Sequence, residues 1–376
     1  MIFLHTSDWH LGATEGEREL REDQYFFIDE ICRIIEERQV DAVLLAGDVY
    51  DRSVGSASAI RLYNYAMERI CRDLKKTVLT IAGNHDSADR LSSCGSLLEK
   101  AGLYISGAAE REARVVAFDD AEVFLLPWVT EEKVRSLYPE ERISDLTGAY
   151  QVLTDHMRER FSPDKKHIVV SHAFITNAET STSDRAAEIG FATQVSASVF
   201  DGFDYVALGH IHKPQNVNGH IRYSGTPMPY SFGKEESQEK SVTLLDTETM
   251  TQEIVPLPLL HQRRTLTGTY EELLNPDCPE EVRTGYVRLN VTDTALGLEL
   301  LSNLRQVYPH PLVVSGKAYE GDGTSISLTM EEFEQMENDP SQVFRSFCRE
   351  EMGQEATPHF VELFEKAVSR YEEGTV

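Results

Sequence analysis

Clusters of Asp, Asn and His side chains recur five times along the chain, each directly after a short apolar segment. The clusters are Asp8-Trp-His10, Gly47-Asp48, Gly83-Asn84-His85-Asp86, Ser171-His172 and Gly209-His210-Ile-His212. They offer oxygen and imidazole ligands and no thiolate, a mixture that suits Mn, Fe, Co or Zn rather than copper(I) or an iron–sulfur cluster. Their recurrence is typical of a hydrolase site that holds two metal ions.

Seven of these side chains are candidate metal ligands: Asp8, His10, Asp48, Asn84, His172, His210 and His212. If the Asp48 carboxylate bridges two ions, each ion has four protein ligands and open positions for water and substrate. Two ions about 3.5–4 Å apart can clamp phosphate oxygens, lower the pKa of a bridging water and stabilise the departing oxygen. We therefore expect hydrolysis of phosphate esters.

The apolar segments before the clusters predict buried β-strands, because they are rich in leucine or in β-branched residues. The predicted strands cover residues 2–6, 42–46, 78–82, 168–170 and 205–208. All five clusters then lie at the carboxyl ends of strands, where layered α/β proteins have their active sites.

The spacing within the clusters also predicts how they are presented. Residues i and i+2 of an extended chain point to the same side, so we expect Asp8 with His10, and His210 with His212, each to present a pair toward one point. Three clusters place a glycine directly before a polar residue, which suits a sharp turn and a backbone that approaches an ion closely.

His85 lies beside Asn84 and is a candidate catalytic residue rather than a ligand. An imidazole can protonate a leaving sugar oxygen or stabilise charge in the transition state. Asp51 and Asp86 are candidates for carboxylates that orient a histidine. Capping a helix or a turn is an equally good interpretation of these two residues.

The bulk composition predicts a soluble cytoplasmic protein of two or three units. A length of 376 residues exceeds one average domain. The N-terminus has neither a basic region nor an apolar signal core, and no run of 18 apolar residues occurs. The five cysteines include no CxxC pair, which argues against a disulfide framework or a thiolate zinc site.

The formal net charge of −27 is unusual for a protein that binds nucleic acid alone, because such a protein needs a basic surface. Any DNA contact must therefore be local or shared. Divalent metals or a basic partner subunit can supply the positive charge that DNA binding needs. The sequence is compatible with both sources. Arg52, Arg90 and Lys213 stand next to the clusters and are candidate phosphate contacts, with surface ion pairs as the alternative.

Residues 1–260 predict one α/β domain, in which strands alternate with helices expected at 25–37, 57–74 and 145–161. This rhythm indicates a sheet with helices packed on it. Residues 176–190 are rich in Ser, Thr, Ala and charge and predict a surface loop beside the site, with a substrate-gating loop as the alternative.

After residue 260 the pattern restarts as a small α+β capping domain over 261–320, followed by an acidic helical tail over 321–376. In the cap, strands are expected at 265–267, 286–291 and 311–317 and helices at 270–274 and 296–307. In the tail, helices are expected at 331–336, 341–351 and 358–371. Apolar residues at helical spacing there suit either packing on the chain itself or docking onto a partner helix.

In these motifs the chain resembles the calcineurin-like metallophosphoesterases, whose pattern is D-x-H, G-D-x-x-D, G-N-H-[DE], a lone His and G-H-x-H. Longer strings are similar to those of the SbcD family of bacterial nuclease subunits. These strings are residues 6–12, 83–91, 205–215 and 223–232. The resemblance spans essentially the whole chain and implies a layered metallophosphoesterase β-sandwich flanked by helices, with a small capping domain and a helical C-terminal tail.

The resemblance also implies roles for individual residues. One metal would be held by Asp8, His10, Asp48 and His212, and the other by Asp48, Asn84, His172 and His210. His85 takes the position of the catalytic histidine, and manganese is the implied ion.

The implied activity is hydrolysis of DNA phosphodiesters, as a 3′ to 5′ exonuclease on duplex ends and an endonuclease on single strands and hairpins. The implied partner is an SbcC-type SMC-like ATPase held by the tail, within a complex that contains a homodimer of the nuclease subunit. Two other functions stay open: a phosphatase or small-molecule phosphodiesterase with the same metals, and a scaffold without activity. The scaffold is disfavoured because no ligand is missing.

Overall fold

The computed structural model describes residues 1–15, 18–181, 183–184, 194–317, 325–329, 341, 344–345, 348 and 356–372. The chain divides into two compact units. Unit 1 consists of Met1–Thr14 and Glu19–Leu260, and unit 2 of Glu15–Arg18 and His261–Val376. Among the described residues, no helix has the length and apolar character needed to cross a bilayer.

The first sheet of unit 1 has six strands in the order β16-β15-β1-β4-β5-β6. Strands β1, β4, β5 and β6 are parallel, and β15 and β16 run antiparallel to their neighbours along one edge. The strands are β1 (Ile2–Thr6), β4 (Ala42–Leu45), β5 (Thr77–Ile81), β6 (Leu103–Ser106), β15 (Ser241–Asp246) and β16 (Thr251–Pro256).

The second sheet of unit 1 also has six strands, in the order β13-β14-β12-β9-β8-β7. The four central strands are parallel, and β13 and β7 close the edges in antiparallel pairing. The strands are β7 (Arg114–Ala117), β8 (Ala121–Leu126), β9 (Lys166–His172), β12 (Tyr205–Gly209), β13 (Gln215–Asn218) and β14 (Ile221–Tyr223).

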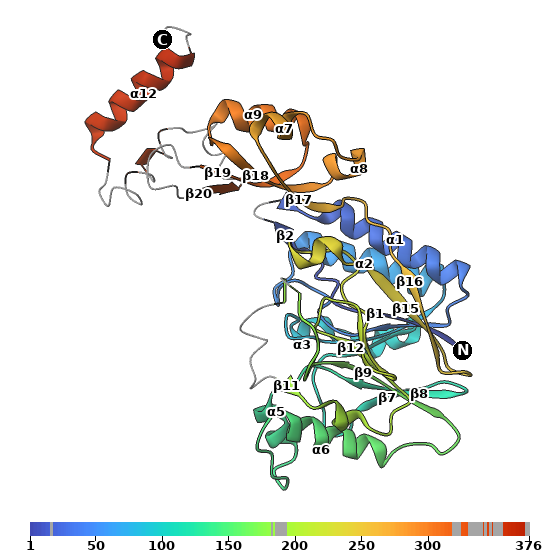
Figure 1. The fold of residues 1–376 in the computed structure, drawn as a ribbon. Coiled ribbons are helices and arrows are strands. Elements are labelled where there is room, and N and C mark those ends of the chain that lie inside the picture. Colours follow the sequence, from blue (N-terminus) through green and yellow to red (C-terminus); the bar gives the residue numbers. More distant parts are fainter. Residues whose placement is uncertain are drawn as a thin grey trace. The chain divides into compact units, whose positions relative to one another are not determined.

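The two sheets share one apolar core, to which Phe3 and Leu44 contribute from the first sheet and Ile168 and Val170 from the second. Because side chains alternate along a strand, the neighbouring residues face outward toward helices. On the outer side of the second sheet, Val169 packs in one core with residues of α5 (Glu131–Leu137) and α6 (Leu146–Arg158). The result is a four-layered arrangement, with helix pairs on both sides of the sheets (Figure 1).

The helices beside the first sheet are α1 (Arg21–Glu37) and α2 (Ala57–Met67). Helix α2 begins where the Ser56 hydroxyl accepts the N–H of Ala59, and it continues into a π-helical segment at Glu68–Asp73. The predicted helix over 57–74 is therefore an α-helix followed by a π-helix. The shorter elements of unit 1 are β10 (Phe174–Ile175), β11 (Gln194–Val195), α3 (Ala88–Leu91), α4 (Gly95–Leu98) and 3₁₀ turns at Glu99–Ala101, Ala197–Phe200 and Lys234–Ser237.

Unit 2 contains a four-stranded sheet in the order β17-β18-β19-β20, in which only β20 is antiparallel to its neighbour. Leu289, Leu304 and Val314 pack together in its core. Its elements are β17 (Arg263–Gly268), α7 (Tyr270–Leu274), α8 (Glu280–Arg283), β18 (Tyr286–Ala295), α9 (Leu298–Val307), β19 (Pro311–Lys317), β20 (Ser325–Thr329) and α12 (Pro358–Glu372). A pair of short strands, β2 (Thr14–Glu15) and β3 (Arg18–Glu19), falls where the two units divide the chain.

The predicted fold class is confirmed. Unit 1 is a layered α/β sandwich, and unit 2 combines a small sheet with helices. The five strands that precede the clusters begin and end within about two residues of their predicted limits. The tail helix expected at 358–371 corresponds to α12. The helix expected at 331–336, and most of the one at 341–351, lie outside the described residues.

The glycines of the clusters make room for protein atoms that would collide with a side chain at these positions. The close approach of their backbone to an ion stays a prediction. A Cβ on Gly83 would lie 2.1 Å from Oδ1 of Asp48, and a Cβ on Gly209 would lie 2.0 Å from the carbonyl oxygen of Ala46. Real Cβ atoms do not approach so closely. Gly209 therefore lets strand ends of the two sheets meet, and Gly83 lets two neighbouring strand ends of the first sheet approach closely.

We predict that Gly209→Ala destabilises unit 1 by about 1–3 kcal/mol, because the methyl group would collide with the Ala46 backbone. Gly219→Ala is the matched control, since a Cβ at Gly219 meets nothing within 4 Å. Urea unfolding followed by tryptophan fluorescence reports on unit 1, because Trp9 and Trp128 both lie there. Equal unfolding midpoints for the two variants would contradict the prediction.

Candidate metal centre

The polar clusters leave their strands through left-handed backbone. Asp8, His10, Asp48 and His210 all have positive φ, with values of 52°, 41°, 48° and 98°. Such conformations cost on the order of 1–3 kcal/mol for residues other than glycine and persist only where the surroundings enforce them. Here the first two turns support each other, because Asp8 N–H donates to the Gly47 carbonyl and His10 N–H to the Asp48 carbonyl, both at 3.0 Å.

Asp8 and His10 do lie in one group, as expected, although the backbone there is left-handed rather than extended. The expectation is wrong for His210 and His212. His212 lies near Asp8 and His10, whereas His210 faces Asn84. The two histidines of one cluster thus enter two different groups of ligands, because the chain turns at His210. This distribution is the one that the family resemblance implied.

The first group contains Asp8, His10 and His212, whose ligand atoms lie within 4.8 Å of one another. Nε2 of His10 is 3.1 Å from Nε2 of His212, and all three side chains are buried. Burial lowers the pKa of His10 to about 3 and that of His212 well below its usual value. Both imidazoles are therefore neutral at physiological pH, the form in which histidine binds metals.

The second group contains Asn84, His172 and His210. Oδ1 of Asn84 lies 2.9 Å from Nε2 of His172 and 3.0 Å from Nδ1 of His210. Nδ1 of His172 is 2.9 Å from the Ala46 carbonyl oxygen, which can only accept, so this nitrogen carries a proton. Nε2 of His172 is then the atom that faces the centre.

Asp48 lies between the two groups. Its Oδ2 is 3.4 Å from Nε2 of His172 on one side and 3.9 Å from Nε2 of His10 on the other. Its Oδ1 accepts the backbone N–H of His85 at 2.9 Å. One carboxylate therefore has ligand atoms of both groups within reach.

The charges of the buried residues fit a divalent metal. Burial, reinforced by the neighbouring Asp48, raises the pKa of Asp8 to about 8. Burial lowers the pKa of His172, but Asp48 and Asp8 outweigh it and raise that pKa to about 9. In the metal-free protein, protons therefore offset the buried negative charge, and a bound cation would do the same.

His85 stands at the edge of the first group, with its ring 4.7 Å from that of His10. Its Nδ1 is 2.7 Å from the Asp51 carbonyl oxygen and must donate to it, which leaves Nε2 facing Asp48 at 3.9 Å. Asp51 also places its carboxylate 3.8 Å from Nδ1 of His10. The backbone of Asp51 thus orients one histidine and its side chain approaches another.

Asp86 secures the turn that carries these residues. Its carboxylate accepts the backbone N–H groups of Val49, Tyr50 and Gly83 at 3.1, 2.9 and 2.9 Å. Of the two interpretations of Asp86 from the sequence, these contacts match the capping of a turn. Burial, with Asp48 nearby, raises the pKa of Asp86 to about 6.

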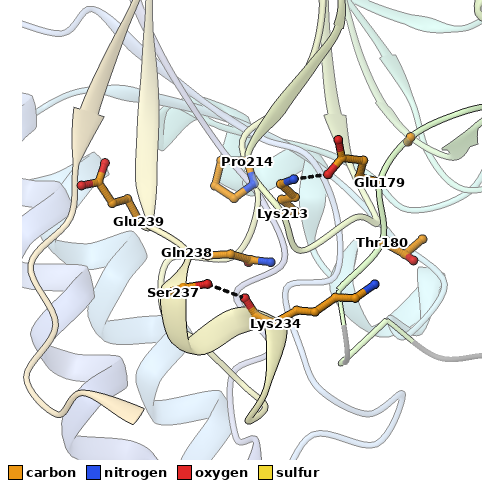
Figure 2. A pocket seen from close by; sticks show the side chains of 9 residues that line it. Glu179, Thr180, Lys213, Pro214, Lys234, Ser237, Gln238 and Glu239 are labelled. Carbon is orange, nitrogen blue, oxygen red and sulfur yellow. Dashed lines mark hydrogen bonds and ion pairs between the residues drawn. The ribbon is translucent and has the colours of Figure 1, made fainter. Parts of the chain in front are cut away.

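The three cations predicted to contact phosphate make local contacts with neighbouring residues. Arg52 pairs with Asp51 at 3.4 Å, and Arg90 donates to the Ser53 carbonyl at 2.9 Å. Lys213 pairs with Glu179 at the edge of a cavity of about 680 Å³, which Figure 2 shows. The contacts of Arg52 and Lys213 match the alternative of surface ion pairs, whereas the described contact of Arg90 is to a backbone carbonyl. A phosphate contact stays a prediction for all three.

Residues from two segments outside the five clusters also reach the site. The segment predicted as a surface loop sends Ser183 and the buried Asp184 onto His212, and Glu235 lies behind Ser183. The Tyr230 ring lies 5.5 Å from that of His10. Tyr230 falls within the string 223–232, and Ser183 and Asp184 fall within the segment 176–190 that was predicted to lie beside the site. Glu235 had no signal in the sequence.

Comparisons with known proteins agree with this geometry. Residues 1–214 match the family model of the calcineurin-like phosphoesterases. The SbcD subunit of the SbcCD nuclease of Staphylococcus epidermidis is 30% identical over 324 residues, which cover 85% of this chain and 86% of that protein. The SbcD subunit of the SbcCD nuclease of Staphylococcus saprophyticus is 26% identical over 379 residues and is matched over the full length of both chains.

The chain therefore belongs to the calcineurin-like phosphoesterases. Within that superfamily, the relatives place it with the SbcD subunits, and the resemblance of the longer strings is confirmed.

Proposed function

We propose that this chain is a nuclease subunit that hydrolyses DNA phosphodiesters with two divalent metal ions, most favourably Mn²⁺. The observation that carries the proposal is the position of Asp48, whose carboxylate has His10 on one side and His172 on the other. The extension from phosphoesterase to nuclease is supported by the names of the two relatives. The proposed ligands are Asp8, His10, Asp48 and His212 for one ion and Asp48, Asn84, His172 and His210 for the other.

The bound ions would supply Lewis acidity toward phosphate oxygens and acidify a coordinated water. The protein's own contribution centres on His85. Because its Nδ1–H is committed to the Asp51 carbonyl, its Nε2 can donate a hydrogen only when the ring is protonated. A protonated His85 would stabilise the charge that develops on the phosphate and can pass its Nε2 proton to the departing sugar oxygen.

The finer activities are proposed on the family resemblance. They are 3′ to 5′ exonuclease action on duplex ends and endonuclease action on single strands and hairpins. The partner would be an SbcC-type SMC-like ATPase, in a complex that contains a homodimer of this chain. The capping domain at 261–320 would contact DNA, and the tail at 321–376 would hold the ATPase. Helix α12 supports the role of the tail, since Phe360 and Leu363 are about half exposed on it.

The shared Asp48 predicts a distinctive pattern of metal loss. The wild-type chain should bind two Mn²⁺ ions, His212→Gln and His172→Gln should each retain one, and Asp48→Asn should lose both. The physical reason is that an amide is a weaker ligand than a carboxylate and Asp48 serves both ions. Elemental analysis after gel filtration gives the stoichiometry, and Asp89→Asn on the exposed end of α3 is the control. A single ion retained by Asp48→Asn would argue against the bridge.

The nuclease proposal is tested by substrate preference. The manganese-loaded chain should cleave labelled DNA and show little turnover of nucleotide monoesters or phosphopeptides. His85→Ala should retain both ions while lowering cleavage by about 10²–10⁴-fold, the usual contribution of a general acid. Activity on monoesters alone would favour the phosphatase alternative. Unchanged cleavage by His85→Ala would remove that residue from the mechanism.

The acidic charge predicts that the isolated chain binds duplex DNA weakly. A net charge of −27 disfavours the approach of DNA to the isolated chain, so engagement of a duplex should require the ATPase partner. Fluorescence anisotropy with a labelled duplex at physiological salt measures this. Tight binding by the chain alone, without partner or ATP, would contradict the prediction.

A further inference from the structure

His212, Ser183 and Glu235 are linked by consecutive hydrogen bonds. Ser183 and Glu235 lie on the side of the His212 ring that faces away from His10. Nδ1 of His212 is 2.5 Å from Oγ of Ser183, and the Ser183 hydroxyl donates to Oε1 of Glu235. The opposite nitrogen, Nε2 of His212, faces His10 at 3.1 Å. These hydrogen bonds therefore connect a buried carboxylate to the nitrogen of His212 that points away from the ligand group.

The segment that carries Ser183 is fixed to His212 by a second contact. Oδ1 of Asp184 accepts the backbone N–H of His212 at 3.1 Å, and Oδ2 accepts the N–H of Ser181 at 2.6 Å. Asp184 is 8% exposed. The carboxylate thus holds the loop in register, so that the Ser183 hydroxyl reaches the imidazole.

Glu235 is held as the last acceptor of these hydrogen bonds. It is 1% exposed, and its carboxylate also accepts the Tyr230 N–H at 2.9 Å and the Ser231 hydroxyl at 3.0 Å. The buried ammonium group of Lys240 lies 3.6 Å away. Burial raises the pKa of Glu235, but Lys240 and the donating groups outweigh it and hold that pKa below its usual range.

The chemistry of the three groups fixes the direction of the hydrogen bonds. An ionised carboxylate can only accept, so the single hydroxyl proton of Ser183 goes to Glu235. Oγ of Ser183 must then accept from Nδ1 of His212, which places the proton of the neutral imidazole on Nδ1. The lone pair is left on Nε2, the nitrogen that faces His10 and Asp8.

We propose that Ser183 and Glu235 are positioning residues that hold His212 in the tautomer with its proton on Nδ1, and so prepare Nε2 for one metal ion. The inference rests on the proposed function for the role of His212 as a ligand. Groups that orient metal-bound histidines typically change metal affinity about 10–100-fold when removed. Binding of the other ion, which His172 and Asn84 would hold, should not depend on the hydrogen bonds of Ser183 and Glu235.

The tautomer can be observed directly in the metal-free protein. Long-range ¹H–¹⁵N correlation spectra of the full chain, labelled on histidine, distinguish a protonated from an unprotonated ring nitrogen. The His212 signals are assigned by their loss in His212→Gln. We expect wild-type His212 to carry its proton on Nδ1 and expect Ser183→Ala and Glu235→Gln to increase the population protonated on Nε2. Ser183→Thr retains a hydroxyl and should restore the wild-type spectrum.

The second readout is binding of Mn²⁺, measured by calorimetry. Ser183→Ala and Glu235→Gln should weaken one of two sites by about 10–100-fold and leave the other unchanged. Glu239→Gln is the matched control, because it removes one negative charge four residues from Glu235 at an exposed position. Ser183→Ala leaves the ion pair between Glu235 and Lys240 intact. It therefore tests the hydrogen-bond link to His212 even where Glu235→Gln lowers the stability of the fold.

Each outcome decides the inference. A His212 proton on Nε2 in the wild-type protein, or a tautomer unchanged in both variants, overturns it. An effect of Ser183→Ala without one of Glu235→Gln overturns the role of Glu235. Failure of the proposed function has a different signature: the tautomer responds as expected, but wild-type protein binds no Mn²⁺ or cleaves no DNA.

Discussion

The burial of Asp48 is the constraint on which the site depends. Its carboxylate lies between imidazoles contributed by strand ends of both sheets, and it is 2% exposed. A buried carboxylate needs compensation by donors or positive charge, and two nearby groups provide it. The His85 amide donates to it, and His172 holds the pKa of Asp48 well below its usual range, against the effect of burial. A bound cation would provide the same compensation more strongly.

The fold brings these groups together by pairing the strands in a fixed register. Parallel pairing of β9 with β12 sets His172 opposite Gly209. The candidate ligands at the ends of these strands therefore lie at the same edge of the sheet. The facing sheet delivers Asp8 and Asp48 from the neighbouring parallel strands β1 and β4. Left-handed turns at these residues are unfavourable alone, and they persist because the packed strand ends allow no other path.

The sequence predicted the parts of this site that depend on local pattern. Strand ends are marked by apolar runs, and ligand types are marked by their chemistry, so the fold class and the cluster Asp8, Asp48 and His172 could be found without coordinates. The turn at His210 could not be predicted, because a positive φ at a residue other than glycine is imposed by its surroundings. The glycines were correctly singled out, but the protein atoms that crowd them come from segments far away in the sequence, such as Asp48 beside Gly83 and Ala46 beside Gly209. The contacts behind His212 could not be predicted from the sequence. Ser183 lies in a loop and Glu235 in a 3₁₀ turn 52 positions further on, and the two meet only through the tertiary fold.

The location of charge reconciles the acidic chain with the DNA substrate that we propose. Most of the excess negative charge can repel DNA only over about a Debye length, near 8 Å at physiological salt. Within the proposed centre, the two carboxylates of Asp8 and Asp48 would face two divalent ions, so the loaded site is locally positive. A phosphodiester is then attracted only where it can be hydrolysed. The rest of a duplex would find little electrostatic attraction on this acidic surface. A partner with a basic surface would supply the attraction that the chain lacks.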